Sequence, residues 1–517
     1  MPEPLEAPPA PDRGFSLRTL LRHSSVYSLA PILQRAAGLL LIPLYTGVLP
    51  EAEWGALSLA DVVILLVPQL VGVNLLGGMT RFYFERREPR ERAAVVSTTT
   101  ILLTGAAWLV VGLALPFRQE LAALLFENRR ASLPGIDFAS LLTLALLIVP
   151  FSISSRCGVI YLQILKYSGV ATSVQTAKTV LELTLKIVML VGFGWGMYGF
   201  LLATLVGEIS TTVGLTGWML WRVRPRIVWR AFTPLLAYSL PMLPVGLFQL
   251  GLHQADRFLL NKLDKLDGLE SAGIYALGYQ VGFLIHTALM TSFMQIWQPL
   301  IFGVESEHAR RRTMVRVGTY AMVILAAAYV PVILFSRQIV ELLAGQPGYL
   351  PAYRVAPWIT CSYLFYAVYS MSQVSLFVAK RTFPLVWING LAFALNVALN
   401  LALIPRFGFV GAAYATMISF AVLAALGALA SRRLSELPFE PLRVLGVLAC
   451  GLACVALAVT LDERFGGGWG ALPVGGTLKV CGGLVVAAIL WRGVLDEDGR
   501  LGLAGIARDV LERVGRL

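Results

Sequence analysis

Apolar blocks of about 20 residues recur along the whole 517-residue chain and are separated by short polar segments. A block of this length crosses a hydrocarbon core of roughly 30 Å as a helix. Segments of about 10 residues with alternating polarity, which form membrane β-barrels, are absent from the sequence. The pattern predicts fourteen membrane-spanning helices, at residues 26–48, 56–79, 95–116, 138–164, 172–193, 196–221, 236–260, 273–301, 314–336, 352–379, 384–404, 408–430, 443–461 and 472–491.

Composition and charge agree with this pattern. Hydrophobic residues make up 57% of the chain and charged residues 14%, whereas soluble proteins carry about 25% charged residues. If the N-terminus is cytoplasmic, the inside segments hold more than three times as many Lys and Arg residues as the outside segments. This bias favours an even number of spans with both termini in the cytoplasm. It also explains the net charge of +12 without a nucleic-acid partner.

An internal repeat relates the two halves of the chain. An offset of 212 residues superposes the segment around Gly196 on that around Gly408, and an offset of 218 superposes Gly55 on Gly273. We therefore predict an all-α polytopic membrane protein with two six-helix lobes in pseudo-two-fold relation, about an axis along the membrane normal, and two additional C-terminal helices. The predicted units are a cytoplasmic tail at 1–24, an N-lobe at 25–226, a C-lobe at 227–436, a helix pair at 437–495 and a cytoplasmic amphipathic tail at 496–517.

Several predicted spans contain charged or amide side chains. An ionisable group inside a span costs several kcal/mol, so it needs a partner, a wet cavity or a route to the interface. Arginine suits a phosphate-binding cavity because its planar guanidinium pairs with two phosphate oxygens at once. We take the following residues as candidates for a substrate cavity: Arg35, Asp61, Arg156, Lys178, Glu182, Lys186, Asn389 and Asn396.

Some of these residues have a second interpretation. Lys178, Glu182 and Lys186 are four residues apart, so an ion-pair ladder along one helix is an equal alternative to a cavity wall. Asp256 and Arg257 are adjacent, and we expect them to form a gate or an interlobe ion pair. Lys479 is expected to reach toward the membrane interface. His253 and His286 are expected to make ordinary hydrogen bonds.

Signatures of enzymes and metal sites are absent from the sequence. It contains no Gly-rich phosphate loop that ends in Lys-Ser or Lys-Thr, and no loop is long enough to form a catalytic domain. The five cysteines all lie in apolar segments and lack the spacing of a metal site. We expect a protein without enzymatic activity, metal or cofactor. Coupling of transport to a gradient of H⁺ or Na⁺ is left open.

Five segments of the chain resemble a known family. They are IPLYTGVLPEAEWGALSLADVV at 42–63, RFYFE at 81–85, ADRFLLNKL at 255–263, AGIYALGYQVG at 272–282 and FGFVGAAYAT at 407–416. Over residues of about 25–435 the chain resembles the Wzx-type polysaccharide transporters of the multidrug/oligosaccharidyl-lipid/polysaccharide exporter superfamily.

The resemblance implies a flippase for undecaprenyl-diphosphate-linked oligosaccharide repeat units. Such a protein moves these units from the cytoplasmic to the periplasmic leaflet by alternating access, for surface polysaccharide biosynthesis. Its partners would be the lipid-linked oligosaccharide, the bilayer and possible polymerase and export machinery. A lipid II flippase is the nearest alternative, because it also carries a diphosphate. A multidrug or organic-cation antiporter is less consistent with the sequence, because the first span contains Arg35 and no acid.

Overall fold

The structure is a computed structural model that describes residues 38–126, 136–264, 267–291, 293–294, 297, 301, 304, 306–435, 437–465 and 472–490. Helices make up nearly all of these residues, and none of them lies in a strand. The helices of the first half are α2 (Ile42–Val48), α3 (Glu51–Val71), α4 (Leu75–Glu85), α5 (Pro89–Ala114), α6 (Arg118–Phe126), α7 (Phe138–Ile164), α8 (Ser168–Ile187), α9 (Gly196–Thr211) and α10 (Gly217–Val223).

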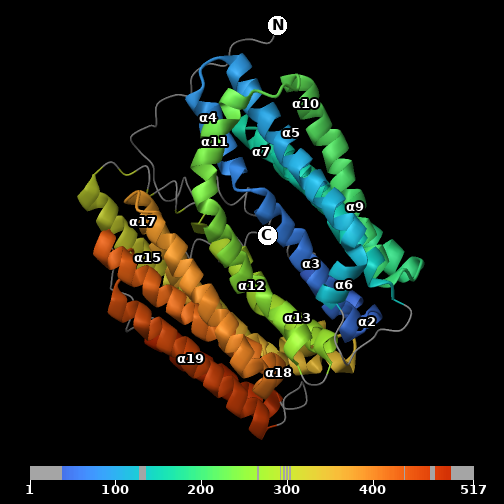
Figure 1. Cartoon of the computed structure of the whole chain (residues 1–517). Coiled ribbons are helices and arrows are strands. Elements are labelled where there is room, and N and C mark those ends of the chain that lie inside the picture. Colours follow the sequence, from blue (N-terminus) through green and yellow to red (C-terminus); the bar gives the residue numbers. More distant parts are fainter. Residues whose placement is uncertain are drawn as a thin grey trace, which may run out of the picture.

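The second half continues with nine further helices. They are α11 (Trp229–Ser239), α12 (Leu243–Leu263), α13 (Gly268–Ile285), α15 (Glu307–Leu334), α16 (Ser336–Leu343), α17 (Ala356–Val378), α18 (Phe383–Leu434), α19 (Pro441–Arg464) and α20 (Thr477–Ile489). The two halves form two bundles, with α3 and α13 between them (Figure 1). One large hydrophobic core lies within the second bundle, and the other extends from the first bundle into α13 and α16 of the second.

The positions of the helices agree closely with the predicted spans. Within the described residues, nine helices are long and apolar enough to cross a membrane. One of the nine, α18, contains two predicted spans. They meet at a kink at Gly408, where the backbone leaves the helical conformation. The predicted span at 56–79 is instead divided into α3 and α4, since Gly72 ends α3 with a φ of 97°. The protein is thus a multi-pass α-helical membrane protein, and the number of fourteen spans stays a prediction.

Backbone conformation supports the internal repeat. Gly196 and Gly408, which the repeat superposes, have φ angles of 52° and 57°. Lys166 and Lys380 precede α8 and α18, and they have φ angles of 62° and 57°. Positive φ is uncommon for residues other than glycine, so the two lysines mark equivalent turns in the two lobes.

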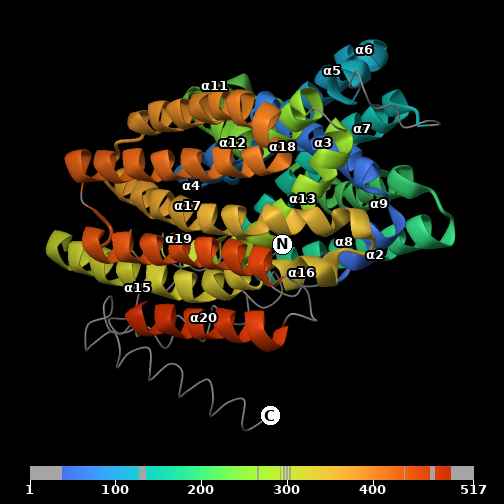
Figure 2. The same cartoon turned by 90° about the horizontal axis from the view of Figure 1, so that it is seen from below.

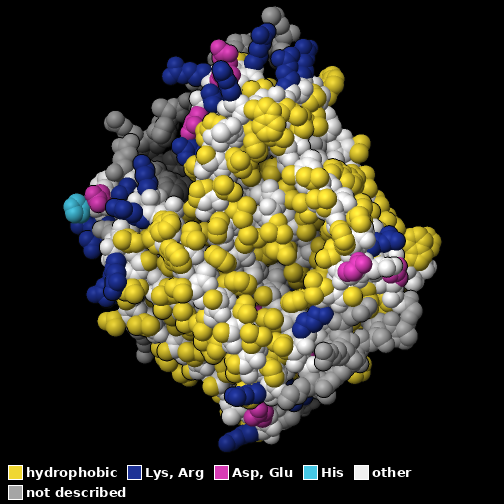
Figure 3. All heavy atoms as spheres, viewed as in Figure 1, with side chains coloured by type: hydrophobic (Ala, Val, Ile, Leu, Met, Phe, Trp, Pro, Cys, Tyr) yellow, Lys and Arg dark blue, Asp and Glu magenta, His cyan; other side chains and the backbone are white. Residues whose placement is uncertain are grey.

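The surface has the polarity expected of a protein in a bilayer. Hydrophobic side chains cover the middle of the face seen in Figure 3, and Lys and Arg gather mainly along its upper and left edges. The sequence just after α4 and the first turns of α15 are rich in arginine, and these segments lie at the upper and left edges in Figure 1. Helices α2, α6 and α16 lie at the opposite end of the molecule (Figures 1 and 2).

The last two helices of the described chain pack on the outside of the C-lobe. α19 contacts α15 and α17, and α20 contacts α19 and α15 (Figure 2). Lys479 of α20 is buried, with its Nζ 2.8 Å from Asp462 Oδ1 and 3.3 Å from Gln338 Oε1. The prediction that Lys479 reaches the interface is wrong, because α20 turns this residue toward a carboxylate at the end of α19. The predicted amphipathic tail lies outside the described residues.

Candidate functional site

The two lobes meet most closely where α3 crosses α13. A Cβ atom on Gly55 would lie 1.9 Å from the carbonyl oxygen of Leu269, and one on Gly273 would lie 2.0 Å from that of Glu51. Only glycine permits such a close backbone approach. The offset of 218 residues relates Gly55 to Gly273 and also Glu51 to Leu269, so the pseudo-two-fold axis passes through this crossing.

Hydrogen bonds between the lobes surround the crossing. Thr46 of α2 donates to the carbonyl oxygen of Leu343 at 2.7 Å and accepts from the backbone N–H of Gly345 at 2.8 Å. Tyr349 donates to the carbonyl oxygen of Leu49 at 2.9 Å. The lobes are therefore joined at the end of the molecule where α2 and α16 lie, opposite the arginine-rich end.

The charged face of α8 is divided between two environments. Lys178 Nζ lies 2.6 Å from Oε1 of Glu208 on α9 and 3.6 Å from Oε1 of Glu182. Ser155 of α7 donates to the other Glu208 oxygen at 2.6 Å. These contacts join α7, α8 and α9 within the N-lobe, so Lys178 takes part in a structural network. The pair of Lys178 with Glu182 follows the predicted ladder along α8. The shorter pair, of Lys178 with Glu208, joins α8 to α9.

Lys186 interacts electrostatically with Glu182, one turn away on α8, and has further neighbours outside this network. Its Nζ lies 4.0 Å from the centre of the Phe200 ring, a cation–π contact. Lys186 also interacts electrostatically with Asp61 of α3, as does Arg257 of α12. Asp61 is exposed and the two cations are half-buried. No direct ion pair joins these three described residues, but cations from both lobes interact electrostatically with the one carboxylate.

Arg156 and Arg35 complete the predicted cationic set. Arg156 is exposed on α7, within a stretch of the helix whose neighbouring side chains are mostly buried. Arg35 lies outside the described residues. The predicted convergence of Arg35, Arg156 and Lys186 on one volume therefore stays a prediction.

Asp256 is fully buried in the C-lobe among uncharged donors. Its Oδ2 accepts hydrogen bonds from Tyr275 of α13 at 2.6 Å and from Thr416 of α18 at 2.5 Å, and its Oδ1 accepts one from Asn400 at 2.7 Å. Arg257 is directed elsewhere: it donates to Gln254 at 2.7 Å and lies over the ring of Tyr279. The expected ion pair between Asp256 and Arg257 is not formed, because adjacent residues of a helix point in different directions.

The predicted asparagines are buried side chains in this conformation. Asn389 donates to the Tyr369 hydroxyl at 2.6 Å and to the carbonyl oxygen of Leu385 at 2.7 Å. Asn396 accepts from Asn400 at 3.1 Å through its Oδ1. Both are fully buried, so neither lines a cavity in this conformation. Asn396 instead adds to the polar surroundings of Asp256.

Three members of the Asp256 cluster are absent from the predicted set of site residues, namely Tyr275, Asn400 and Thr416. Tyr275 and Thr416 lie in segments used for the repeat and the family resemblance, which is the signal that could have identified them. The predicted hydrogen bonds of the histidines are confirmed. His253 Nδ1 lies 2.8 Å from the Tyr279 hydroxyl, and His286 Nδ1 lies 3.3 Å from that of Tyr329.

Comparison with known proteins identifies the family. Residues 48–349, more than half of the chain, match the model of a family described as "Polysaccharide biosynthesis protein". The chain belongs to this family. Among curated proteins, none matches the sequence significantly.

Solved structures with the same fold are members of the MOP exporter superfamily and a lipid II flippase. The flippase MurJ in an inward closed conformation aligns with a TM-score of 0.74 and 14% identity, over 91% of this chain and 100% of that one. An inward-facing multidrug resistance MATE family transporter of the MOP superfamily aligns with a TM-score of 0.62 and 14% identity, over 84% of this chain and 96% of that one. A MOP superfamily transporter from Pyrococcus furiosus aligns with a TM-score of 0.60 and 13% identity, over 83% of this chain and 96% of that one. It is described as having a binding pocket of reverse polarity. At these identities the likeness shows the fold, which is that of the MOP exporters.

Proposed function

We propose that the protein flips polyprenyl-diphosphate-linked oligosaccharides across the bacterial inner membrane for surface polysaccharide biosynthesis. Membership of the polysaccharide biosynthesis family and the MOP exporter fold support a lipid-linked substrate. The observation that carries the proposal is that Lys186 of the N-lobe and Arg257 of the C-lobe both interact electrostatically with Asp61. The flipped product would then pass to a polymerase and export machinery.

This group suggests how a diphosphate would be recognised. Asp61 offsets part of the charge of Lys186 and Arg257 without a direct ion pair to either. A diphosphate carries more negative charge than one carboxylate, and its oxygens accept bidentate hydrogen bonds from a guanidinium. It would therefore compete successfully with Asp61 for both cations. Because the cations belong to different lobes, binding would draw the lobes together at this level.

The sealed end of the molecule supports alternating access. The close contacts at Gly55 and Gly273 block passage at the end where α2 and α16 lie. By the positive-inside rule we assign the arginine-rich end to the cytoplasm. We therefore assign the structure to a state closed toward the periplasm. Opening would require separation of α3 from α13 along the pseudo-two-fold axis.

Asp256 is our proposed site of ion coupling. A fully buried carboxylate inside a membrane protein is costly, and neutral donors offset only part of that cost. Binding of H⁺ or of a small cation such as Na⁺ would neutralise it, and carboxylate, hydroxyl and amide oxygens are suitable ligands for a hard cation. Asp256→Asn should remove the dependence of transport on an ion gradient. Comparing an H⁺ gradient with a Na⁺ gradient in the wild-type protein distinguishes the two ions.

A lipid II flippase remains the second candidate, favoured by the alignment with MurJ over 100% of the length of that protein. Both candidate functions require recognition of a lipid diphosphate. Their substrates differ in the sugar or peptide attached to it. An organic-cation antiporter would instead need a site of the opposite charge, and the cations Lys186 and Arg257 argue against it.

Reconstitution into liposomes tests the proposal. The protein would be given a fluorescent polyprenyl-diphosphate oligosaccharide or fluorescent lipid II, and the label in the outer leaflet would be quenched over time. We expect translocation of the oligosaccharide, at least a tenfold loss in Lys186→Gln and Arg257→Gln, and no loss in the exposed Arg433→Gln control. Translocation of lipid II alone would support the second candidate, and translocation of neither would overturn both.

A further inference from the structure

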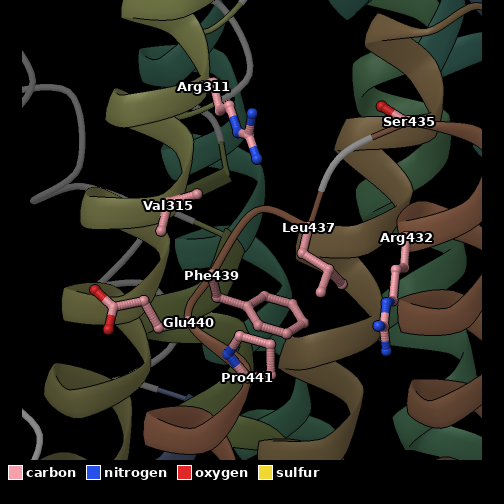
Figure 4. A pocket seen from close by; sticks show the side chains of 8 residues that line it. All are labelled: Arg311, Val315, Arg432, Ser435, Leu437, Phe439, Glu440 and Pro441. Carbon is pink, nitrogen blue, oxygen red and sulfur yellow. The ribbon is translucent and has the colours of Figure 1, made fainter.

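A pocket of about 450 Å³ lies at the arginine-rich end of the C-lobe, far from the interlobe charges (Figure 4). Arg311 of α15 and Arg432 at the end of α18 approach it from opposite walls. Leu437, Phe439 and Pro441 form an apolar surface between them. A second hollow of about 760 Å³ shares Arg311 and adds other residues of α15, namely His308, Arg312, Thr313, Arg316 and Val317.

The segment that forms the floor of the pocket is held firmly in place. A Cβ atom on Gly318 of α15 would lie 2.0 Å from the carbonyl oxygen of Pro438, so this segment packs directly on the helix backbone. The backbone N–H of Glu440 donates to Thr319 at 2.9 Å. Phe439 is buried. The floor of the pocket is therefore fixed by its packing on α15.

Among the charged residues described in the walls of the two hollows, arginines predominate. Arg311, Arg312, Arg316 and Arg432 line the two hollows, and the acid that lines both is Glu440. Glu440 Oε2 already lies 2.9 Å from Nε of Arg443. The pocket thus combines several guanidinium groups with an apolar floor, which matches a phosphate attached to a hydrophobic molecule.

The surroundings place the pocket at the boundary between apolar and charged surface. Just beyond it on α19, the side chains of Leu442 and Leu445 are 84% and 59% exposed. Such leucines on a membrane helix face acyl chains, whereas the arginines of α15 face the headgroup region. A ligand in the pocket would therefore have acyl chains beside α19 and its phosphate between Arg311 and Arg432.

We propose that this pocket binds the phosphate of an anionic phospholipid from the adjacent leaflet. The lipid would bridge α15 to the junction of α18 and α19, and so fasten the outer helix pair to the C-lobe. This site is separate from the proposed transport site and does not depend on it. Its occupant is a resident lipid, recognised by its phosphate and its acyl chains together.

The test uses the purified full-length protein in mixed micelles. Phosphatidylglycerol or phosphatidylcholine would be titrated while thermal unfolding is followed, and bound lipid would be counted by native mass spectrometry. The test variant is Arg311→Gln with Arg432→Gln. The matched control is Arg310→Gln with Arg433→Gln, which removes the same charge from neighbouring positions that do not line the pocket.

We expect phosphatidylglycerol to raise the unfolding temperature of the wild-type protein and of the control. The apparent affinity of the test variant should be about thirtyfold lower, the effect of two basic residues near an anionic headgroup. Equal responses of both variants would overturn the proposal. The same stabilisation by phosphatidylcholine, or by inorganic phosphate alone, would also overturn it. Native mass spectrometry gives the same comparison if the test variant is less stable before lipid is added.

Discussion

In the N-lobe, Lys178 and Lys186 lie near Glu182, Glu208 and Asp61, so charge is offset by charge. In the C-lobe, Asp256 is surrounded by hydroxyl and amide donors. Apart from the buried Glu208, these N-lobe charges are partly exposed, whereas Asp256 is fully buried. Under the proposed function this difference corresponds to two tasks: Lys186 would exchange partners with a large anion, and the buried carboxylate would accept only something as small as an ion.

A third arrangement, at the helix pair, provides the strongest test of charge compensation. Lys479→Ala leaves Asp462 buried without its cation, which should lower the free energy of unfolding by about 3–5 kcal/mol. Replacing both residues with apolar ones, as in Lys479→Met with Asp462→Leu, should restore most of the stability. Unfolding in detergent measures both. If the single and double variants are equally destabilised, the loss is due to packing and not to unpaired charge.

The Asp256 cluster should show the next largest effect. Asp256→Ala removes the acceptor of three buried hydrogen bonds, and we expect a loss of about 2–3 kcal/mol. Asp256→Asn keeps one oxygen acceptor and should lose less. The same unfolding assay compares them. Equal losses would mean that the hydrogen bonds to Asp256 contribute little.

The glycine crossing connects the two lobes, and its disruption should affect closure. Gly55→Ala places a methyl group against the carbonyl oxygen of Leu269, and overpacking of this kind costs about 1–3 kcal/mol. Hydrogen exchange in the segment 343–349, which contacts α2 at the sealed end, should become about tenfold faster. Gly105→Ala is the control, because no atom lies within 4 Å of its added Cβ. Unchanged exchange in Gly55→Ala would show that the crossing does not hold this end closed.

The smallest effect is expected at Lys178. Its side chain is 22% exposed, so solvent screens its ion pair with Glu208. Lys178→Ala should cost about 0.5–1 kcal/mol of stability, and transport should remain within about threefold of wild type. Lys186→Gln should show the reverse, with stability kept and transport lost. Equal transport defects in the two variants would contradict the division of α8 into a structural and a functional part.

The sequence predicted the spans well because span length and hydropathy are local properties. The predicted span at 138–164 coincides with α7. The repeat was also visible, since Gly196 and Gly408 each serve a turn that requires positive φ. Side-chain partners were harder to predict. Asp256 pairs with Asn400 and Thr416, which are 144 and 160 residues away, whereas the adjacent Arg257 was the obvious partner in sequence. Lys479 was misassigned for the same reason: its carboxylate partner is on another helix.

The central claim is that Lys186 and Arg257, from different lobes, bind one diphosphate. A double-mutant cycle with Lys186→Gln and Arg257→Gln tests it most directly, with the affinity for a polyprenyl diphosphate without sugar as the readout. Because both cations would contact the same group, we predict a coupling energy of about 1 kcal/mol or more. A polyprenyl alcohol should bind all four proteins alike. Strictly additive losses, or no loss in either single variant, would contradict the claim.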